Sequence, residues 1–299
     1  MTPTQEATVV DTAVNVEYTA INTDRELHNE ESSTYWLPKD DEEQKRLTGQ
    51  HFLFKEFFEG NISRSVREAL DFEKGISVLD VGCGSGVWIM DMINDYPNCT
   101  YHGCDIVDTT NKILKVDQFT YNYGNVLVGL PYEDNTFDFV HMRFFALALR
   151  KEEWPIALKE AVRVVKPGGR IQLTEPGMRL PDDNSSAYYK FIKAVRSVAH
   201  SKGQDSYIAY QLEKLLTETN MVKIIQHDIR HCNMSSNTAT AKKFIWDFVE
   251  IAKSLLRFIG PNLGLNSKEE ISRFLDELEH CLSHTNCYVY ASCVSAQKL

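Results

Sequence analysis

The chain has 299 residues, of which 43% are hydrophobic and 25% charged, and its formal net charge is −10. These values are ordinary for a globular protein with one large α/β domain or two smaller ones. The acidic balance argues against a broad nucleic-acid-binding face, which would gather Lys and Arg. We expect no secretory signal and no membrane span, because no basic start precedes an apolar run and no apolar run approaches about 20 residues.

Seven cysteines are scattered along the chain, and no two are spaced as CxxC. This pattern predicts neither a zinc site nor a dithiol redox site, so we expect no metal. Reduced thiols favour an intracellular protein. We expect it in the cytoplasm and leave nuclear residence open, since partners can carry a protein in without a basic localisation signal.

The N-terminal part is predicted to contain a polar, flexible arm over residues 1–30 and a helical cap segment over residues 31–70. Asp40 or Asp41 can cap a helix whose first turn is acidic. Apolar residues then recur at roughly helical spacing, which indicates a helix that packs onto the rest of the protein: Leu47, Phe54, Phe57 and Phe58.

Strand and helix signals alternate through residues 71–181 and continue less regularly to the end of the chain. Repeated β-α-β units predict a parallel sheet with helices on both faces and right-handed connections. We predict strands over residues 76–81, 100–106, 136–143, 170–176, 222–231 and 287–296, and we expect residues 119–124 to precede a further short strand. We predict helices over residues 87–94, 152–165, 184–203, 205–219, 239–258 and 267–282, with "KPGG" closing the second and the capping box "SKEE" opening the last.

The stretch "VLDVGCGSGVW" places Gly82, Gly84 and Gly86 directly after Asp80. Glycine is used where the backbone turns sharply or lets a ligand come close, and a plain strand-to-helix turn is the simpler alternative. The dinucleotide pattern GxGxxG fails, because Val87 stands at its third glycine, and no Gly-Lys-Ser/Thr follows for a phosphate loop. Asp80 would repel a pyrophosphate but suits a ligand with a cationic end.

Asp105 ends the second predicted strand, 21 residues after Gly84. An acid at this place can accept hydrogen bonds from both hydroxyls of a ribose. The two acids together therefore predict a nucleoside whose other end is not phosphate. S-adenosylmethionine fits this description, since it joins adenosine to a sulfonium and an ammonium group.

Four stretches carry a family resemblance: "VLDVGCGSGVW", "GCDI", "LPYEDNTFDFVHMR" and "RVVKPGGRIQLTEP". They resemble, in order and spacing, the motifs of class I S-adenosylmethionine-dependent methyltransferases over roughly residues 70–180. "YWLPKDDEEQKRLTGQHFLFK" adds a resemblance to a fungal subgroup that includes regulators of secondary metabolism. In the second half the resemblance is weak, because "TETNMVKII" stands where many relatives carry Gly-Phe.

The resemblance implies a fold, namely a doubly wound, Rossmann-like α/β sheet of seven strands. Six strands would be parallel, and the last, over residues 287–296, would be antiparallel and inserted beside its neighbour. Residues 71–181 would form the cofactor-binding core. Residues 182–299 would supply helical cap insertions and the last two strands of the same sheet, and the cap would exclude water and select the substrate.

The resemblance also implies roles at the cofactor. Asp80 and the glycine loop would handle the methionine end, and Asp105 the ribose. Asn125 would meet the adenine amino group, unless it only caps its loop, and Tyr35 would fold over the cofactor, unless it is core. The full set of implied cofactor contacts is Tyr35, Asp80, Gly82, Cys83, Gly84, Gly86, Asp105, Ile106, Asn125, Val126, His141 and Arg143.

Two residues are candidate catalysts. His141 follows a strand at the carboxyl edge of the sheet and can act as a base, since the pKa of His lies near neutrality; a structural, cofactor-packing His is the alternative. Glu175 ends the fifth predicted strand and would face the substrate, the alternative being a solvated or capping acid. Arg143 would be structural or contact the tail carboxylate of the cofactor.

The implied reaction is in-line methyl transfer to an unidentified acceptor, for which a small molecule is the leading candidate and a protein remains open. We expect no nucleic-acid or membrane partner, and the sequence gives no indication of oligomeric state. The alternative from another class is a cofactor-binding, non-catalytic regulator that acts through protein partners. A nicotinamide-dependent reductase is disfavoured by Val87 and Asp80.

Overall fold

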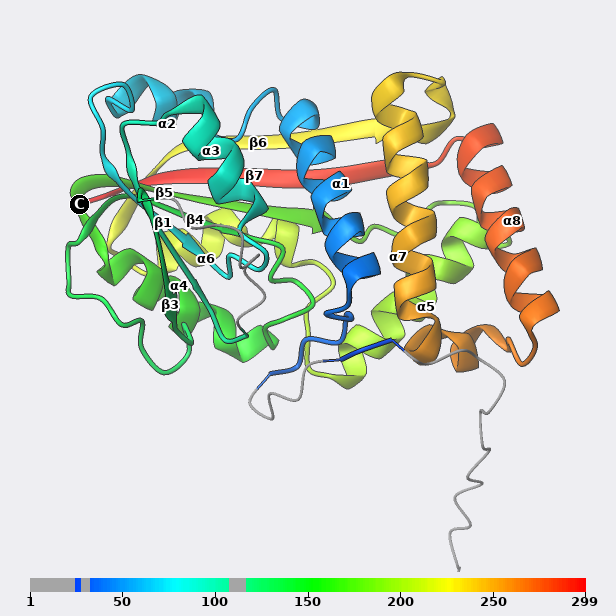
Figure 1. The fold of residues 1–299 in the computed structure, drawn as a ribbon. Helices are drawn as coiled ribbons and strands as arrows, with labels where there is room; N and C mark the ends of the chain where they lie inside the picture. The colour runs from blue at the N-terminus through cyan, green and yellow to red at the C-terminus, as the bar shows by residue number, and fades with distance from the viewer. Residues whose placement is uncertain (1–24, 28–32, 108–116) are drawn as a thin grey trace, which may run out of the picture.

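The computed structural model describes residues 25–27, 33–107 and 117–299 (Figure 1). Its centre is a seven-stranded sheet in the order β3-β2-β1-β4-β5-β7-β6. Strand β7 runs antiparallel to both of its neighbours, whereas β1 to β5 pair in parallel. The predicted fold class and the inserted last strand are therefore confirmed. The strands are β1 Ser77–Val81, β2 Thr100–Asp105, β3 Phe119–Tyr123, β4 Phe137–Arg143, β5 Val165–Gly177, β6 Val222–Asn233 and β7 Tyr288–Lys298.

The helices lie on both faces of the sheet and beyond one of its ends. In Figure 1, α2 and α3 lie on one side of the sheet and α4 and α6 on the other. The helices are α1 Asp41–Phe57, α2 Arg64–Ala69, α3 Val87–Asp95, α4 Trp154–Arg163, α5 Ala187–Ser201, α6 Leu212–Glu218, α7 Ala239–Leu263 and α8 Lys268–His284. Short 3₁₀ turns cover Lys151–Glu153, Ile208–Tyr210 and Met234–Ser236.

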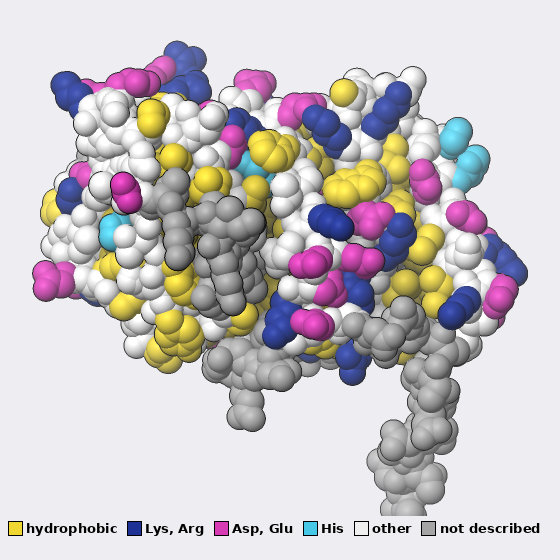
Figure 2. All heavy atoms as spheres, in the orientation of Figure 1, with side chains coloured by type: hydrophobic (Ala, Val, Ile, Leu, Met, Phe, Trp, Pro, Cys, Tyr) yellow, Lys and Arg dark blue, Asp and Glu magenta, His cyan; other side chains and the backbone are white. Residues whose placement is uncertain are grey.

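Three long strands create the platform for the cap. Strands β5, β6 and β7 have 13, 12 and 11 residues, whereas β1 to β4 have 5 to 7. At about 3.3 Å per residue, these three strands reach well past β1 to β4. Helices α1, α5, α7 and α8 gather at this extension (Figure 1), and over α1 and α7 the outward face mixes both signs of charge (Figure 2).

Asp40 caps α1, as one of the two alternatives predicted. Its side chain accepts a hydrogen bond from the backbone N–H of Glu43, and Arg25 donates to it at 2.6 Å and 2.9 Å. Of the predicted arm, residues 1–24 and 28–30 lie outside the described residues. Within the described part of the chain, no helix is both long and apolar enough to cross a membrane.

Most boundaries shift by a few residues, and four elements differ more. The predicted helix over residues 205–219 is a 3₁₀ turn, Ile208–Tyr210, followed by the short helix α6, Leu212–Glu218. Helix α2 was not predicted; it has six residues, too few for a periodic signal. Helix α7 continues past Phe258 to Leu263, because Gly264, with a φ of 69°, supplies the left-handed residue that ends it. Strand β5 begins at Val165 and not at residue 170, since the "KPGG" turn lies between two positions paired with β4.

Candidate functional site

The loop between β1 and α3 requires its glycines. Gly82, Gly84 and Gly86 have φ values of 68°, 52° and 79°, a region that side chains other than glycine rarely adopt. A Cβ atom on Gly82 would lie 2.4 Å from the Phe145 ring, so this position is closed by packing. A Cβ on Gly84 would meet no heavy atom within 4 Å. The loop therefore turns sharply and also leaves open space beside Gly84.

Two carboxylates stand at the carboxyl ends of neighbouring strands. Asp105, at the end of β2, accepts hydrogen bonds from the backbone N–H groups of Gly84 at 2.9 Å and Val107 at 3.1 Å. Burial is the largest influence on Asp105 and raises its pKa. Each oxygen keeps a further lone pair, so Asp105 can still accept from a ligand. Asp80, near the end of β1, is buried and faces His141.

His141 lies behind Asp80. Its Nδ1 is 2.8 Å from the Asp80 carboxylate, and its ring stacks on Trp88 with centroids 4.0 Å apart. Burial lowers the pKa of His141, which favours the neutral ring, and a neutral ring bonded to a carboxylate carries its proton on Nδ1. This geometry orients Asp80.

Arg143, at the end of β4, is tied to helix α3 through His51. The Arg143 guanidinium donates to Nδ1 of His51 at 3.1 Å, and Nε2 of His51 donates to Asp91 at 2.9 Å. Burial lowers the pKa of His51 to about 4 and that of Arg143 to about 10. At neutral pH the His51 ring is therefore uncharged and the Arg143 guanidinium is charged. This chain of hydrogen bonds requires an uncharged ring, because Nδ1 of His51 must accept a hydrogen bond.

These groups surround a cavity of about 200 Å³, here called the sheet-edge cavity. It lies where β1 adjoins β4, at the point where the strand order reverses, which is the usual ligand position in open α/β sheets. Ten of the predicted cofactor residues line it: Tyr35, Asp80, Gly82, Cys83, Gly84, Asp105, Ile106, Asn125, Val126 and Arg143.

Two predicted cofactor residues are not on this wall. Gly86 is the N-cap of α3, and His141 lies behind Asp80. Asn125 is on the wall, and its side-chain oxygen also accepts from the backbone N–H of Leu127 at 2.9 Å. It therefore caps its own loop while facing the cavity.

Helix α1 adds two residues to the sheet-edge cavity that sequence reasoning missed, Gln44 and Leu47. The side-chain oxygen of Gln44 is buried and has no hydrogen-bond partner among the described residues. A buried polar atom without a partner is uncommon, and a bound ligand would satisfy it. The i, i+3 spacing of these two residues places them on one helix face, but no local signal shows what that face covers.

A second cavity, of about 110 Å³, lies under the cap and is here called the cap cavity. Its wall is mostly apolar and comes from α1, α5 and α7, with Phe191, Ile192 and Phe244 among its members. Tyr35, Leu47 and Phe144 line both cavities, which are therefore adjacent.

The backbone between the two cavities is strained. Phe144 has a φ of 65°, which is unfavourable for a bulky residue and costs on the order of 1–3 kcal/mol. Glu175 holds the following residues, accepting from the backbone N–H groups of Phe145 at 2.6 Å and Ala146 at 3.0 Å. Burial raises the pKa of Glu175 to about 8, although both bonds favour the charged form. Glu175 is thus not a solvated acid; it lines the cap cavity and fixes the loop.

A buried ion network joins α1 to α7 at the cap cavity. Arg46 donates to Glu43 at 2.7 Å and to Asp247 at 2.9 Å. Gln50 donates to the other oxygen of Asp247 at 3.0 Å, and Ser254 donates to Glu43 at 2.6 Å. Since 201 residues separate Arg46 from Asp247, this network joins two segments that are distant in the sequence.

Comparison with known proteins gives a match to a family described as "Methyltransferase domain" over residues 78–169. The secondary metabolism regulator LaeA of Coprinopsis cinerea is 28% identical over 162 residues, which are 54% of this chain and 40% of that protein. The demethylmenaquinone methyltransferase of Staphylococcus carnosus is 29% identical over 156 residues, 48% of this chain and 62% of that protein. The chain thus matches less than two thirds of the length of either relative.

Solved structures agree in fold. A phosphoethanolamine N-methyltransferase 2 of Haemonchus contortus, in complex with phosphomonomethylethanolamine and S-adenosylhomocysteine, has a TM-score of 0.51 and 15% identity, covering 86% of this chain and 58% of that one. The [4+2]-cyclase SpnF has a TM-score of 0.51 and 18% identity, covering 89% and 99%. At these identities the likeness concerns the fold, which hosts more than one reaction. Residues 78–169, which contain the glycine loop and both acids, are therefore similar to a methyltransferase domain.

Proposed function

We propose that this protein transfers a methyl group from S-adenosylmethionine to a small molecule with an apolar body. The observation that carries the proposal is the adjacency of the two cavities, which share Tyr35, Leu47 and Phe144. One cavity is polar at its acids and suits the cofactor, and the other is mostly apolar and suits the acceptor.

The residues of the sheet-edge cavity fit the cofactor. Asp105 keeps lone pairs for the ribose hydroxyls, and Val126 and the loop of Asn125 offer an apolar wall and polar atoms for the adenine. The open space at Gly84 lets the ligand approach the backbone. Asp80 supplies negative charge for the ammonium and sulfonium end. When bound, the cofactor supplies a methyl group on a positively charged sulfur, which is already an activated leaving group.

The chain's own task is then alignment and exclusion of water. His141 orients Asp80 through a 2.8 Å hydrogen bond, and we assign it this positioning role. Glu175 holds the strained segment at Phe144, where the cavities meet. Glu175 lies on the cap-cavity wall and is also our candidate to take the proton of an acceptor hydroxyl or amine. With a pKa of about 8, its ionised form, which alone can take that proton, gains population above neutral pH.

The relatives bear on the biological setting. The match to a fungal regulator of secondary metabolism supports the proposal of a fungal protein in that process. We propose a cytoplasmic or nuclear location. The same match keeps the alternative of a regulator that binds the cofactor, acts through protein partners and transfers no methyl group.

Calorimetric titration with S-adenosylmethionine and S-adenosylhomocysteine tests cofactor binding. Transfer is followed with methyl-labelled cofactor and fractions of a small-molecule extract. Val195→Phe places a larger side chain on the wall of the cap cavity and narrows that cavity. We expect this variant to retain its affinity for the cofactor and to lose methyl transfer. Absence of cofactor binding by the wild type would overturn the proposal, and binding without transfer to any fraction would favour the regulator.

A further inference from the structure

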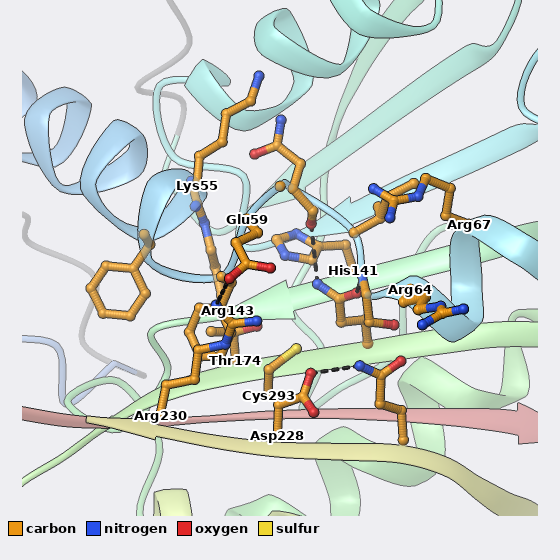
Figure 3. Close-up of a pocket in the computed structure, with 18 of the residues that line it drawn as sticks. Lys55, Glu59, Arg64, Arg67, His141, Arg143, Thr174, Asp228, Arg230 and Cys293 are labelled. Atoms are coloured by element: carbon orange, nitrogen blue, oxygen red, sulfur yellow. Dashed lines mark hydrogen bonds and ion pairs between the residues drawn. The ribbon is translucent and has the colours of Figure 1, made fainter. Parts of the chain in front are cut away.

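A third cavity, of about 260 Å³, lies on the face of the sheet beside α2. We call it the cationic groove. Figure 3 shows Arg64 and Arg67 entering it from α2 on one side and Arg230 from β6 on the other. Lys55 and Arg143 bring the cations on its wall to five, whereas Glu59 and Asp228 are its acids. Its lining is therefore positive, although the whole chain has a net charge of −10.

Several of these cations are open to an anion. Among the described residues, Arg67 has no carboxylate within 4.0 Å. Arg143 is less available, because it already donates to His51, and Lys55 pairs with Asp91 at 2.8 Å and with Asp95 at 2.9 Å. Arg230 pairs with Glu59 at 3.0 Å, but the Glu59 side chain is 78% exposed. Arg64 pairs only with Glu68, and both of those side chains are more than half exposed. Exposed pairs of this kind contribute about 0–1 kcal/mol, so a ligand can replace them.

The floor of the groove is built and polar. Gln172, on β5, is 3% exposed; it accepts from the backbone N–H of Ser63 at 2.7 Å and donates to the carbonyl of Asn61 at 3.1 Å. These bonds fix the segment that precedes α2 over the sheet. This edge of the groove is thus in place before any ligand arrives.

We propose that the cationic groove binds the phosphate group of a small molecule. The planar guanidinium fork matches phosphate oxygens, and here three arginines, Arg64, Arg67 and Arg230, line one groove from α2 and β6. The volume lies near the lower end of the ~300–1,000 Å³ of ligand pockets, which suits a compact ligand. An extended nucleic acid would need a longer track of cations than this acidic chain offers.

Titration calorimetry without cofactor tests this site independently of methyl transfer. The probes are inorganic phosphate, glucose 6-phosphate and pyrophosphate at constant low ionic strength. We expect saturable binding of at least one probe, weakened roughly tenfold or more by Arg67→Gln and by Arg230→Gln, since each removes a charge-assisted hydrogen bond. Tighter binding of the ester than of the free anion would assign the phosphate to an organic molecule, and the reverse to the free ion.

The matched control is Arg273→Gln, which removes the same charge from an exposed position on α8. If this control loses as much affinity for the probes as the groove variants do, the effect comes from net charge alone and the proposal is overturned. The absence of saturable binding would also overturn it. Tighter binding of a single-stranded oligonucleotide than of pyrophosphate would also overturn it, in favour of a nucleic-acid surface. Arg67 is exposed, so its substitution leaves the fold intact, which the melting temperature verifies.

Discussion

Replacement of Gly84 by alanine separates ligand contact from backbone strain. The φ of Gly84 is 52°, and the left-handed region costs about 1–2 kcal/mol for a residue with a Cβ atom. The smaller entropy of the unfolded alanine chain offsets about 0.4–1 kcal/mol. No heavy atom lies within 4 Å of the new Cβ, so no steric cost is added. The variant should lose about 1 kcal/mol of unfolding free energy, as measured by urea denaturation.

Gly84→Ala should also weaken the binding of S-adenosylhomocysteine, by more than the loss of folding stability alone would cause. The new methyl group enters the sheet-edge cavity, and we expect the dissociation constant to rise roughly tenfold or more, which corresponds to about 1.4 kcal/mol. Gly264→Ala is the matched control, because Gly264 has a φ of 69°, no heavy atom within 4 Å of its ideal Cβ, and a place at the end of α7.

The two variants are compared by calorimetry and urea denaturation under the same conditions. If both variants lose similar stability and only Gly84→Ala loses affinity, the result would support a contact between the ligand and the backbone at Gly84. Wild-type affinity in Gly84→Ala would refute the reasoning that a ligand approaches this backbone. Equal loss of affinity in Gly264→Ala would show that the effect is global.

Asp105→Asn should weaken cofactor binding roughly tenfold or more with an unchanged circular dichroism spectrum, because one acceptor oxygen becomes a donor; wild-type affinity by calorimetry would contradict the ribose assignment. Arg46→Met leaves Asp247 buried without its cation and Glu43 with Arg25 alone, at 3.6 Å, so urea denaturation should show a loss of about 3–5 kcal/mol, and a loss below about 1 kcal/mol would count against the network. The pKa of His51 is lowered from 6.5 to about 4 by burial, so the unfolded chain takes up the proton first and stability should fall as pH drops from 6.5 through 4, by up to about 3 kcal/mol. His51→Gln should show a smaller loss over that window, and an unchanged pH profile would refute this linkage.

The sequence was informative where function depends on neighbouring residues. Gly82, Gly84 and Gly86 adopt positive φ, as their spacing after a strand indicates. Asp105 reaches the same loop because parallel neighbouring strands bring their carboxyl ends to one edge of the sheet. Strand periodicity and capping signals likewise predicted most elements, since both arise within a few residues.

Tertiary structure decided what these residues face. The sequence left His141 as either a base or a structural residue, and pairing of β4 with β1 places it behind Asp80 and against Trp88. The cap cavity depends on α1 meeting α7, which no local pattern indicates because Arg46 and Asp247 are 201 residues apart. The cationic groove likewise forms only because the folded chain places α2 beside β6.

The physical reason is the range of the interactions. Backbone conformation and side-chain alternation are set by contacts within one turn or one strand, so they can be recognised in a short stretch of sequence. Cavities, ion networks and the partners of a buried side chain arise from segments that meet only when the chain is packed, and many sequences with the same local pattern pack them differently. The glycine loop and its acids could therefore be predicted, whereas the cap cavity and the cationic groove could not.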